Sequence, residues 1–158
     1  MVSNVSVGDW VQGSERFLRP VKKATGGSTA IARGKVVALN ESTGVWGLPG
    51  TGGAVYTRKG VVTHTNTDSD ATMIIMTGGG TVYVTADGAI KPDSPVETST
   101  SNDGNVIALS ASGTYAANIG REPLGYYRGH ADEGDGSSDN PATDAAATDK
   151  IKVELSRN

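Results

Sequence analysis

The chain has 158 residues, 22 of them glycine, with 36% hydrophobic and 5% aromatic residues, no cysteine and a net charge of −3. This composition fits one domain with a thin core, or one domain with an arm, and it excludes disulfides, thiolate metal ligands and a cysteine nucleophile. The chain is acidic and has neither a clustered basic face nor about 20 consecutive apolar residues, so we expect it to bind neither nucleic acid nor a membrane.

The first 30 residues differ from the rest of the chain. They mix apolar and positive side chains without a clear periodicity, at Trp10, Arg16, Phe17, Leu18, Arg19, Lys22 and Lys23. This pattern is typical of an arm that becomes ordered against a partner. The alternative is a first strand that pairs with the core sheet. We interpret residues 1–30 as an N-terminal arm and residues 31–158 as a β-rich domain.

Six short apolar or alternating runs predict β-strands, because each is bounded by residues that favour turns. These runs are Val36–Leu39, Gly60–Thr63, Met73–Met76, Thr81–Val84, Val106–Leu109 and Ile151–Leu155. The run Thr77–Gly80 predicts a tight hairpin connection, since glycine accepts the positive φ of such turns. The one helix we expect is short, near residues 140–148, with a loop as the alternative. Strands at this spacing predict a mainly β sandwich or barrel.

Two stretches share a pattern. Gly34–Leu39 is followed by Gly44-Val45-Trp46, and Gly104–Leu109 is followed by Gly113-Thr114-Tyr115. Each predicts a strand, a polar turn and a second strand with an aromatic residue near its start. Two hairpins of similar design are one explanation. The other is a duplicated hairpin whose copies occupy comparable places in the fold.

Catalytic motifs are missing from the sequence. The two histidines, His64 and His130, are expected at a strand end and in a solvated loop. There is no Gly-x-Ser-x-Gly elbow, and Gly34-Lys35-Val36 departs from a phosphate-binding loop at its third residue. We therefore expect no enzymatic activity and no cofactor.

The acidic residues within 132–139 do not have the spacing of an EF-hand loop. We interpret this stretch as a charged surface loop rather than a calcium site, so no metal is expected.

The order of these runs resembles the capsid decoration, or cement, proteins of tailed bacteriophages. Ala32–Leu39, Gly44-Val45-Trp46 and Gly60-Val61-Val62 follow the strand, turn and glycine-led strand of these families. Met73–Met76, Gly79–Val84 and Pro92 are similar to the lambda-type head-decoration protein, and Thr148–Leu155 looks like the closing strand of related cement proteins. The resemblance covers roughly residues 30–155. The length after Pro92 and the acidic stretch depart from the shortest members.

The resemblance implies a small β-barrel or tulip-like domain with an extended N-terminal arm and little helix. It implies a homotrimer on the outer surface of the virion, at three-fold or quasi-three-fold sites. The partner would be a major capsid protein of the HK97-type fold, whose expanded shell the trimer stabilises. The arm would contact the capsid through the seven residues named above.

The alternative function is a carbohydrate- or receptor-binding β-module of a phage tail or fibre. In that case Trp46, Tyr115, Tyr126 and Tyr127 would be candidates to stack on sugar rings.

Overall fold

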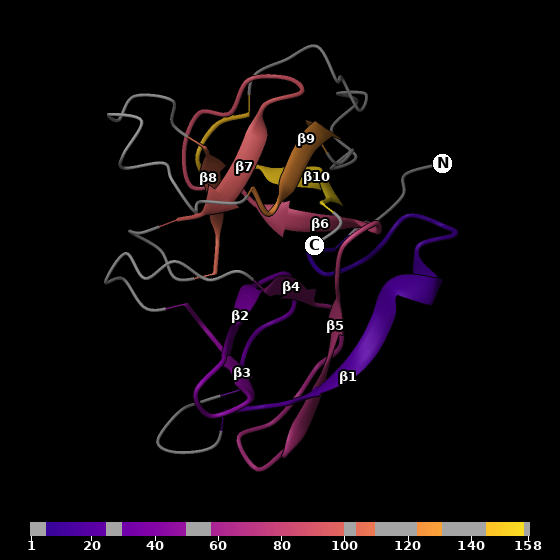
Figure 1. Ribbon diagram of the computed structural model, residues 1–158. Coiled ribbons are helices and arrows are strands. Elements are labelled where there is room, and N and C mark those ends of the chain that lie inside the picture. Colours follow the sequence, from indigo (N-terminus) through magenta and orange to yellow (C-terminus); the bar gives the residue numbers. More distant parts are fainter. Residues whose placement is uncertain are drawn as a thin grey trace.

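The computed structural model describes residues 6–24, 30–49, 58–99, 104–109, 123–130 and 145–156. Its ten strands and one turn of 3₁₀ helix form two antiparallel five-stranded sheets, one above the other in Figure 1. The prediction of a mainly β protein with little helix is therefore confirmed. Within the described ranges, no helix is both long enough and apolar enough to span a membrane.

The first sheet has the strand order β1-β5-β4-β2-β3 and follows a short helix, η1 (Glu15–Phe17). Its strands are β1 (Leu18–Lys22), β2 (Val36–Asn40), β3 (Val45–Gly47), β4 (Lys59–Val62) and β5 (Thr72–Met76). The second sheet has the order β6-β10-β9-β7-β8. Its strands are β6 (Thr81–Thr85), β7 (Pro95–Thr98), β8 (Val106–Ala108), β9 (Gly125–His130) and β10 (Lys150–Leu155).

All six predicted runs lie in or overlap strands, whereas β7 and β9 were not predicted. The predicted hairpin at Thr77–Gly80 is wrong, because this segment connects β5 of the first sheet to β6 of the second. His130, expected in a loop, is the last residue of β9, because this strand extends far enough to pair with Ile151 of β10. Residues 145–148, at the end of the predicted helix, form a bridge and a turn instead. The start of that predicted helix lies outside the described residues.

The two sheets repeat one topology. If β6 to β10 are matched in order with β1 to β5, the strand order is the same in both sheets. The registers agree as well. Val37 of β2 opposes Gly60 of β4, and Val96 of β7 opposes Gly125 of β9. The molecule therefore consists of two halves built on the same plan.

Each sheet curls until its two edge strands touch at one point. Lys23, next after β1, forms a parallel bridge with Trp46 of β3, and Ala86, next after β6, forms one with Val106 of β8. In both halves the N–H of the following residue donates to the bridged carbonyl, at 2.8 and 2.7 Å. Because β3 and β8 have only three residues each, the contact does not extend into a ladder. Neither sheet, as far as it is described, is the closed barrel that the family resemblance implied.

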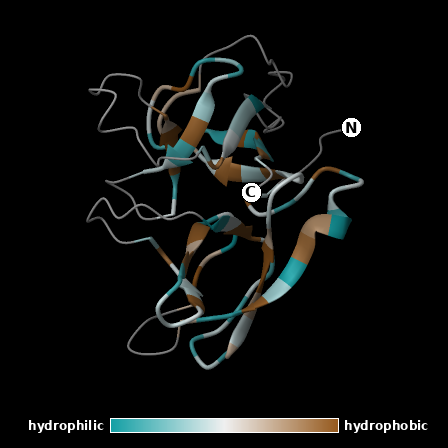
Figure 2. Ribbon diagram, in the orientation of Figure 1, coloured by the Kyte–Doolittle hydropathy of each residue, from teal (hydrophilic) through white to brown (hydrophobic). Residues whose placement is uncertain are grey.

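The cores of the two halves use equivalent positions. The matching buried pairs are Ile31 and Ile90, Val37 and Val96, Trp46 and Val106, Val62 and Tyr127, Met73 and Ile151, and Ile75 and Val153. Val36, Val61 and Met76 belong instead to the core of the second half, so one face of the first sheet packs on that core. Figure 2 shows hydrophobic residues in the strands of both sheets. Burying such a side chain contributes about 1.5–3 kcal/mol, which joins the halves into one hydrophobic unit.

The shared pattern in the sequence does not match the repeat in the structure. The β2 strand lies inside its sheet, between β3 and β4, whereas β8 is at the end of its sheet and pairs with β7. The two similar stretches therefore do not occupy comparable places. The explanation that Gly34–Leu39 and Gly104–Leu109 begin two copies of one duplicated hairpin is wrong. Residues 113–115 lie outside the described part of the chain.

One side chain in the first half replaces a backbone pair of the second. Ile90 and Ala145 exchange two N–H to O=C bonds of 3.1 and 2.8 Å. At the equivalent position, Ile31 donates to the Asn66 side-chain oxygen at 3.0 Å and accepts from the Asn66 side-chain nitrogen at 2.7 Å. A carboxamide carries the same donor and acceptor as a peptide group. Buried Asn66 therefore completes the pairing that the backbone of Ala145 completes in the other half.

We predict that Asn66→Ala lowers the free energy of unfolding by roughly 2–4 kcal/mol, because it leaves two buried polar groups of Ile31 unpaired. Urea unfolding followed by tryptophan fluorescence measures the change. Thr65→Ala, on the exposed neighbour, is the control and should stay within about 0.5 kcal/mol of the native protein. An Asn66 variant that matched this control would show that the carboxamide does not replace the backbone pair.

Candidate functional site

Residues 6–14, which we call the strap, connect the two halves. The Gly8 N–H donates to the Tyr83 carbonyl at 2.7 Å, and the Val11 N–H donates to the Thr81 carbonyl at 3.0 Å. Both acceptors belong to β6, at the edge of the second sheet. The strap therefore covers backbone groups that this edge would otherwise expose.

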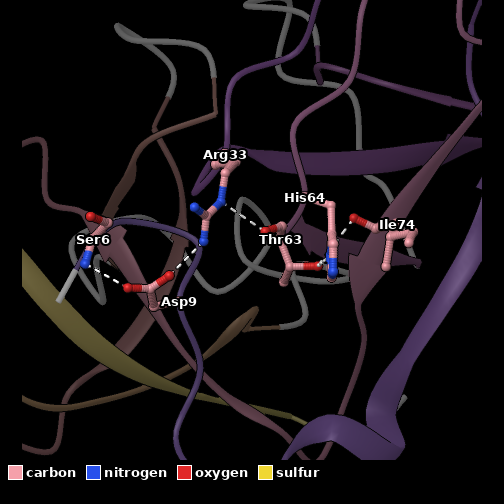
Figure 3. Close-up of polar contacts among 6 residues, drawn as sticks. All are labelled: Ser6, Asp9, Arg33, Thr63, His64 and Ile74. Carbon is pink, nitrogen blue, oxygen red and sulfur yellow. Dashed lines mark hydrogen bonds and ion pairs between the residues drawn. The ribbon is translucent and has the colours of Figure 1, made fainter.

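Polar contacts hold the strap to the first half (Figure 3). The Asp9 carboxylate pairs with the Arg33 guanidinium at 2.5 Å and accepts the Ser6 N–H at 2.7 Å. Arg33 also donates to the Thr63 carbonyl at 2.8 Å, and the Thr63 hydroxyl lies 2.9 Å from Nδ1 of His64. The ion pair is partly exposed, so it contributes at most about 1 kcal/mol. Its main effect is to fix the position of the strap.

Close packing completes this attachment. The Trp10 ring stacks on His64, which follows β4 as expected for a residue at a strand end, with 5.5 Å between ring centroids. Gly8 and Gly34 both have positive φ, and a Cβ on Gly34 would lie 2.5 Å from Cβ of Val7. Only glycine permits this approach without a shift of the backbone.

The N-terminal region therefore packs on the domain wherever it is described. Residues 6–24 form the strap, η1 and β1, and β1 pairs with β5 from Leu18↔Met76 to Lys22↔Thr72. Over this stretch the structure matches the alternative of a first strand that pairs with the core sheet. Contact between residues 1–30 and a capsid stays a prediction.

The seven candidate capsid-binding residues fall into three environments. Trp10 is partly buried against His64. Lys23 is 1% exposed, and its Nζ donates to the Thr67 carbonyl at 2.5 Å, so its charge lies inside the protein. The other five lie together on η1 and β1, and they are Arg16, Phe17, Leu18, Arg19 and Lys22.

Two stacked arginines mark this surface, which we call the basic edge and define as Arg16, Arg19 and Lys22 on η1 and β1. The Arg16 guanidinium lies 4.8 Å from the centre of the Phe17 ring, and that of Arg19 lies 5.5 Å from the Trp46 ring. Stacking fixes the plane of a guanidinium and leaves its N–H donors available. The basic edge therefore presents preoriented donors to solvent.

The cations of the basic edge have no carboxylate partner among the described residues. Elsewhere, Arg33 pairs with Asp9, and Arg128 pairs with Asp93 and Glu154 at 2.6 and 2.9 Å. These two carboxylates raise the pKa of Arg128 and hold its guanidinium over the Tyr126 ring. Exposed cations without such partners in an acidic protein indicate a surface for a negative partner.

Metal binding is the other chemistry considered for this chain. No three His, Asp or Glu side chains there gather in a way that could hold a metal. The acidic stretch 132–139 and the side chain of His130 lie outside that part.

No protein-family model matches the chain, and a search of curated proteins finds no significant match.

We predict that Trp10→Ala loosens the strap locally, because it removes the stack on His64. A loss on the order of 2 kcal/mol corresponds to roughly 30-fold faster amide exchange. Hydrogen exchange should show this at Gly8 and Val11, with no change at Val61 in the core. The control is Val11→Ala, since the Val11 side chain is exposed. Unchanged exchange at Gly8 in the Trp10 variant would contradict the stacking role.

Proposed function

We propose that the protein is a structural virion protein that binds the outer surface of a viral capsid and stabilises the expanded shell. It does so as a homotrimer at three-fold or quasi-three-fold sites of a shell built from an HK97-type major capsid protein. The observation that supports this proposal best is the basic edge. On a chain of net charge −3, the exposed cations Arg16, Arg19 and Lys22 share one edge, and no carboxylate in the described ranges pairs with them.

Multivalency makes such a small surface sufficient. Three exposed cations contribute modestly to binding, since contacts at a polar rim act more on association rate and orientation than on affinity. A trimer presents three such edges to one site, and linked contacts can raise avidity by a factor of 10²–10⁴. Weak single contacts then add up to stable attachment.

The carbohydrate-binding alternative has less support. Of its four candidate aromatic residues, Trp46 is 6% exposed and Tyr127 is fully buried, so neither presents a ring face for stacking. Tyr126 is exposed, but the Arg128 guanidinium lies over its ring. Tyr115 lies outside the described residues.

We predict that the protein co-sediments with expanded shells. The double charge reversal R16E/K22E should weaken this binding roughly 10- to 100-fold, at about 1 kcal/mol or more for each charge. Raising the salt concentration should also weaken the binding of the native protein to the shells. Lys91→Glu, which reverses one exposed cation on the second half, is the control for a charge reversal outside the basic edge. A native protein that stayed in the supernatant at low salt would overturn the proposed function.

Deleting residues 1–20 is not a suitable test, because it removes the strap and three of the five residues of β1 along with Arg16 and Arg19. Charge reversal at exposed positions leaves the backbone pairing of β1 intact.

We also predict a solution mass of three chains, about 48 kDa from 16.1 kDa each, by light scattering at two concentrations. A mass that stayed at one chain would remove the multivalency argument.

A further inference from the structure

We propose that the outer edge of β1 docks a short, extended, acidic segment of a partner protein, in the way that the strap docks on β6. The inference deepens the proposed function and rests on it for the identity of the partner, which would be the shell protein. The chemistry of the site itself follows from the repeat.

In the repeat, β1 occupies in the first half the position that β6 occupies in the second half. Leu18 opposes Met76 on β5, and Thr81 opposes Glu154 on β10, which makes Leu18 the counterpart of Thr81. Two residues further along, Pro20 is the counterpart of Tyr83. The Thr81 and Tyr83 carbonyls are the acceptors that the strap uses.

The corresponding carbonyls of β1 point away from its sheet. The Phe17 carbonyl accepts the Thr77 N–H of the segment after β5 at 3.2 Å, so the odd-numbered residues of β1 bond towards β5. In an antiparallel pair the residues between them turn their backbone groups to the other side. Leu18 and Pro20 therefore aim their carbonyls outward, and no described segment donates to them.

This edge offers acceptors but few donors. The Leu18 N–H is already bonded to the Glu15 carbonyl, and Pro20 has no N–H. A long strand, or β1 of a second copy, therefore cannot form a regular ladder here, which protects the edge from aggregation. A short peptide that donates two N–H groups still fits. Nucleic acid does not, since its phosphodiester backbone has no such donors.

The charge of the basic edge indicates which side chains the partner segment carries. Arg19 lies between the two open carbonyls, and Arg16 and Lys22 lie two residues beyond them at either end, so a segment lying along β1 would meet three cations distributed over its two faces. The strap shows the same combination within this protein, because it donates two N–H groups to β6 while its Asp9 pairs with Arg33. The partner is therefore an extended polypeptide of about four residues with carboxylate side chains.

The test uses a capped decapeptide in which pairs of Glu alternate with pairs of Val, so that carboxylates lie on both faces of the extended segment. The readout is the amide shifts of the isotope-labelled full chain. We expect shifts that centre on β1 and saturate with a Kd of about 1 mM. The variant R19E/K22E should lose this response and gain one to the matching Lys and Val decapeptide, whereas Lys91→Glu should behave as the native chain. Shifts centred on another edge, or no shifts at several times this concentration, would overturn the inference.

Shell binding separates this inference from the proposed function. A native chain that binds shells, with R16E/K22E binding equally well, would overturn the β1 site and leave the proposed function standing. A chain that binds the acidic probe at β1 but does not bind shells would support the site and overturn the proposed function.

Discussion

The unpaired backbone groups at the edges of two small sheets are the constraint from which the rest of this structure follows. Each five-stranded sheet has two edges, and each edge exposes a row of N–H and C=O groups. One bridge in each half, at Lys23 and at Ala86, joins the edges only at a single point. The strap covers what remains on β6, and this requires the close contact between Gly8 and Gly34. On β1 no segment that the structure describes covers the corresponding groups.

Two equivalent positions on the edge strands carry a charge in the first half and an apolar side chain in the second. Arg19 is the counterpart of Val82, and Lys23 is the counterpart of Ala86, by their registers in the two sheets. Lys23 is accommodated inside the protein by the Thr67 carbonyl, but Arg19 reaches solvent across the Trp46 ring. Natural proteins tend to break local folding rules at functional sites. The departure at Arg19 therefore supports a binding role for the basic edge.

The sequence predicted the strands that have uninterrupted apolar runs, and it missed those that do not. The β7 strand begins at Pro95, and β9 contains Gly125 and Gly129, which are residues that argue against a strand. The repeat was missed because equivalent positions share only isolated identities, such as Gly60 with Gly125. At Gly125 an added Cβ would overlap the Glu154 carbonyl oxygen, so glycine is retained for a tertiary reason that no local pattern shows.

The candidate site was predicted in part. The sequence places Arg16, Arg19 and Lys22 close to Phe17, and the structure exposes all three cations, whereas their contact with a capsid stays a prediction. The sequence could not show that Lys23 is buried, because lysine is almost never fully buried and its position depends on the bridge to Trp46. Nor could it show that Trp10 belongs to a strap on the other half. Both facts depend on contacts between segments far apart in the sequence.

Cryo-electron microscopy of expanded shells incubated with the protein tests the central claim most directly. The account predicts trimeric density on the outer surface at three-fold and quasi-three-fold positions, with η1 and β1 facing the shell. Shells that carry no added density, or density confined to a tail or fibre, would contradict it.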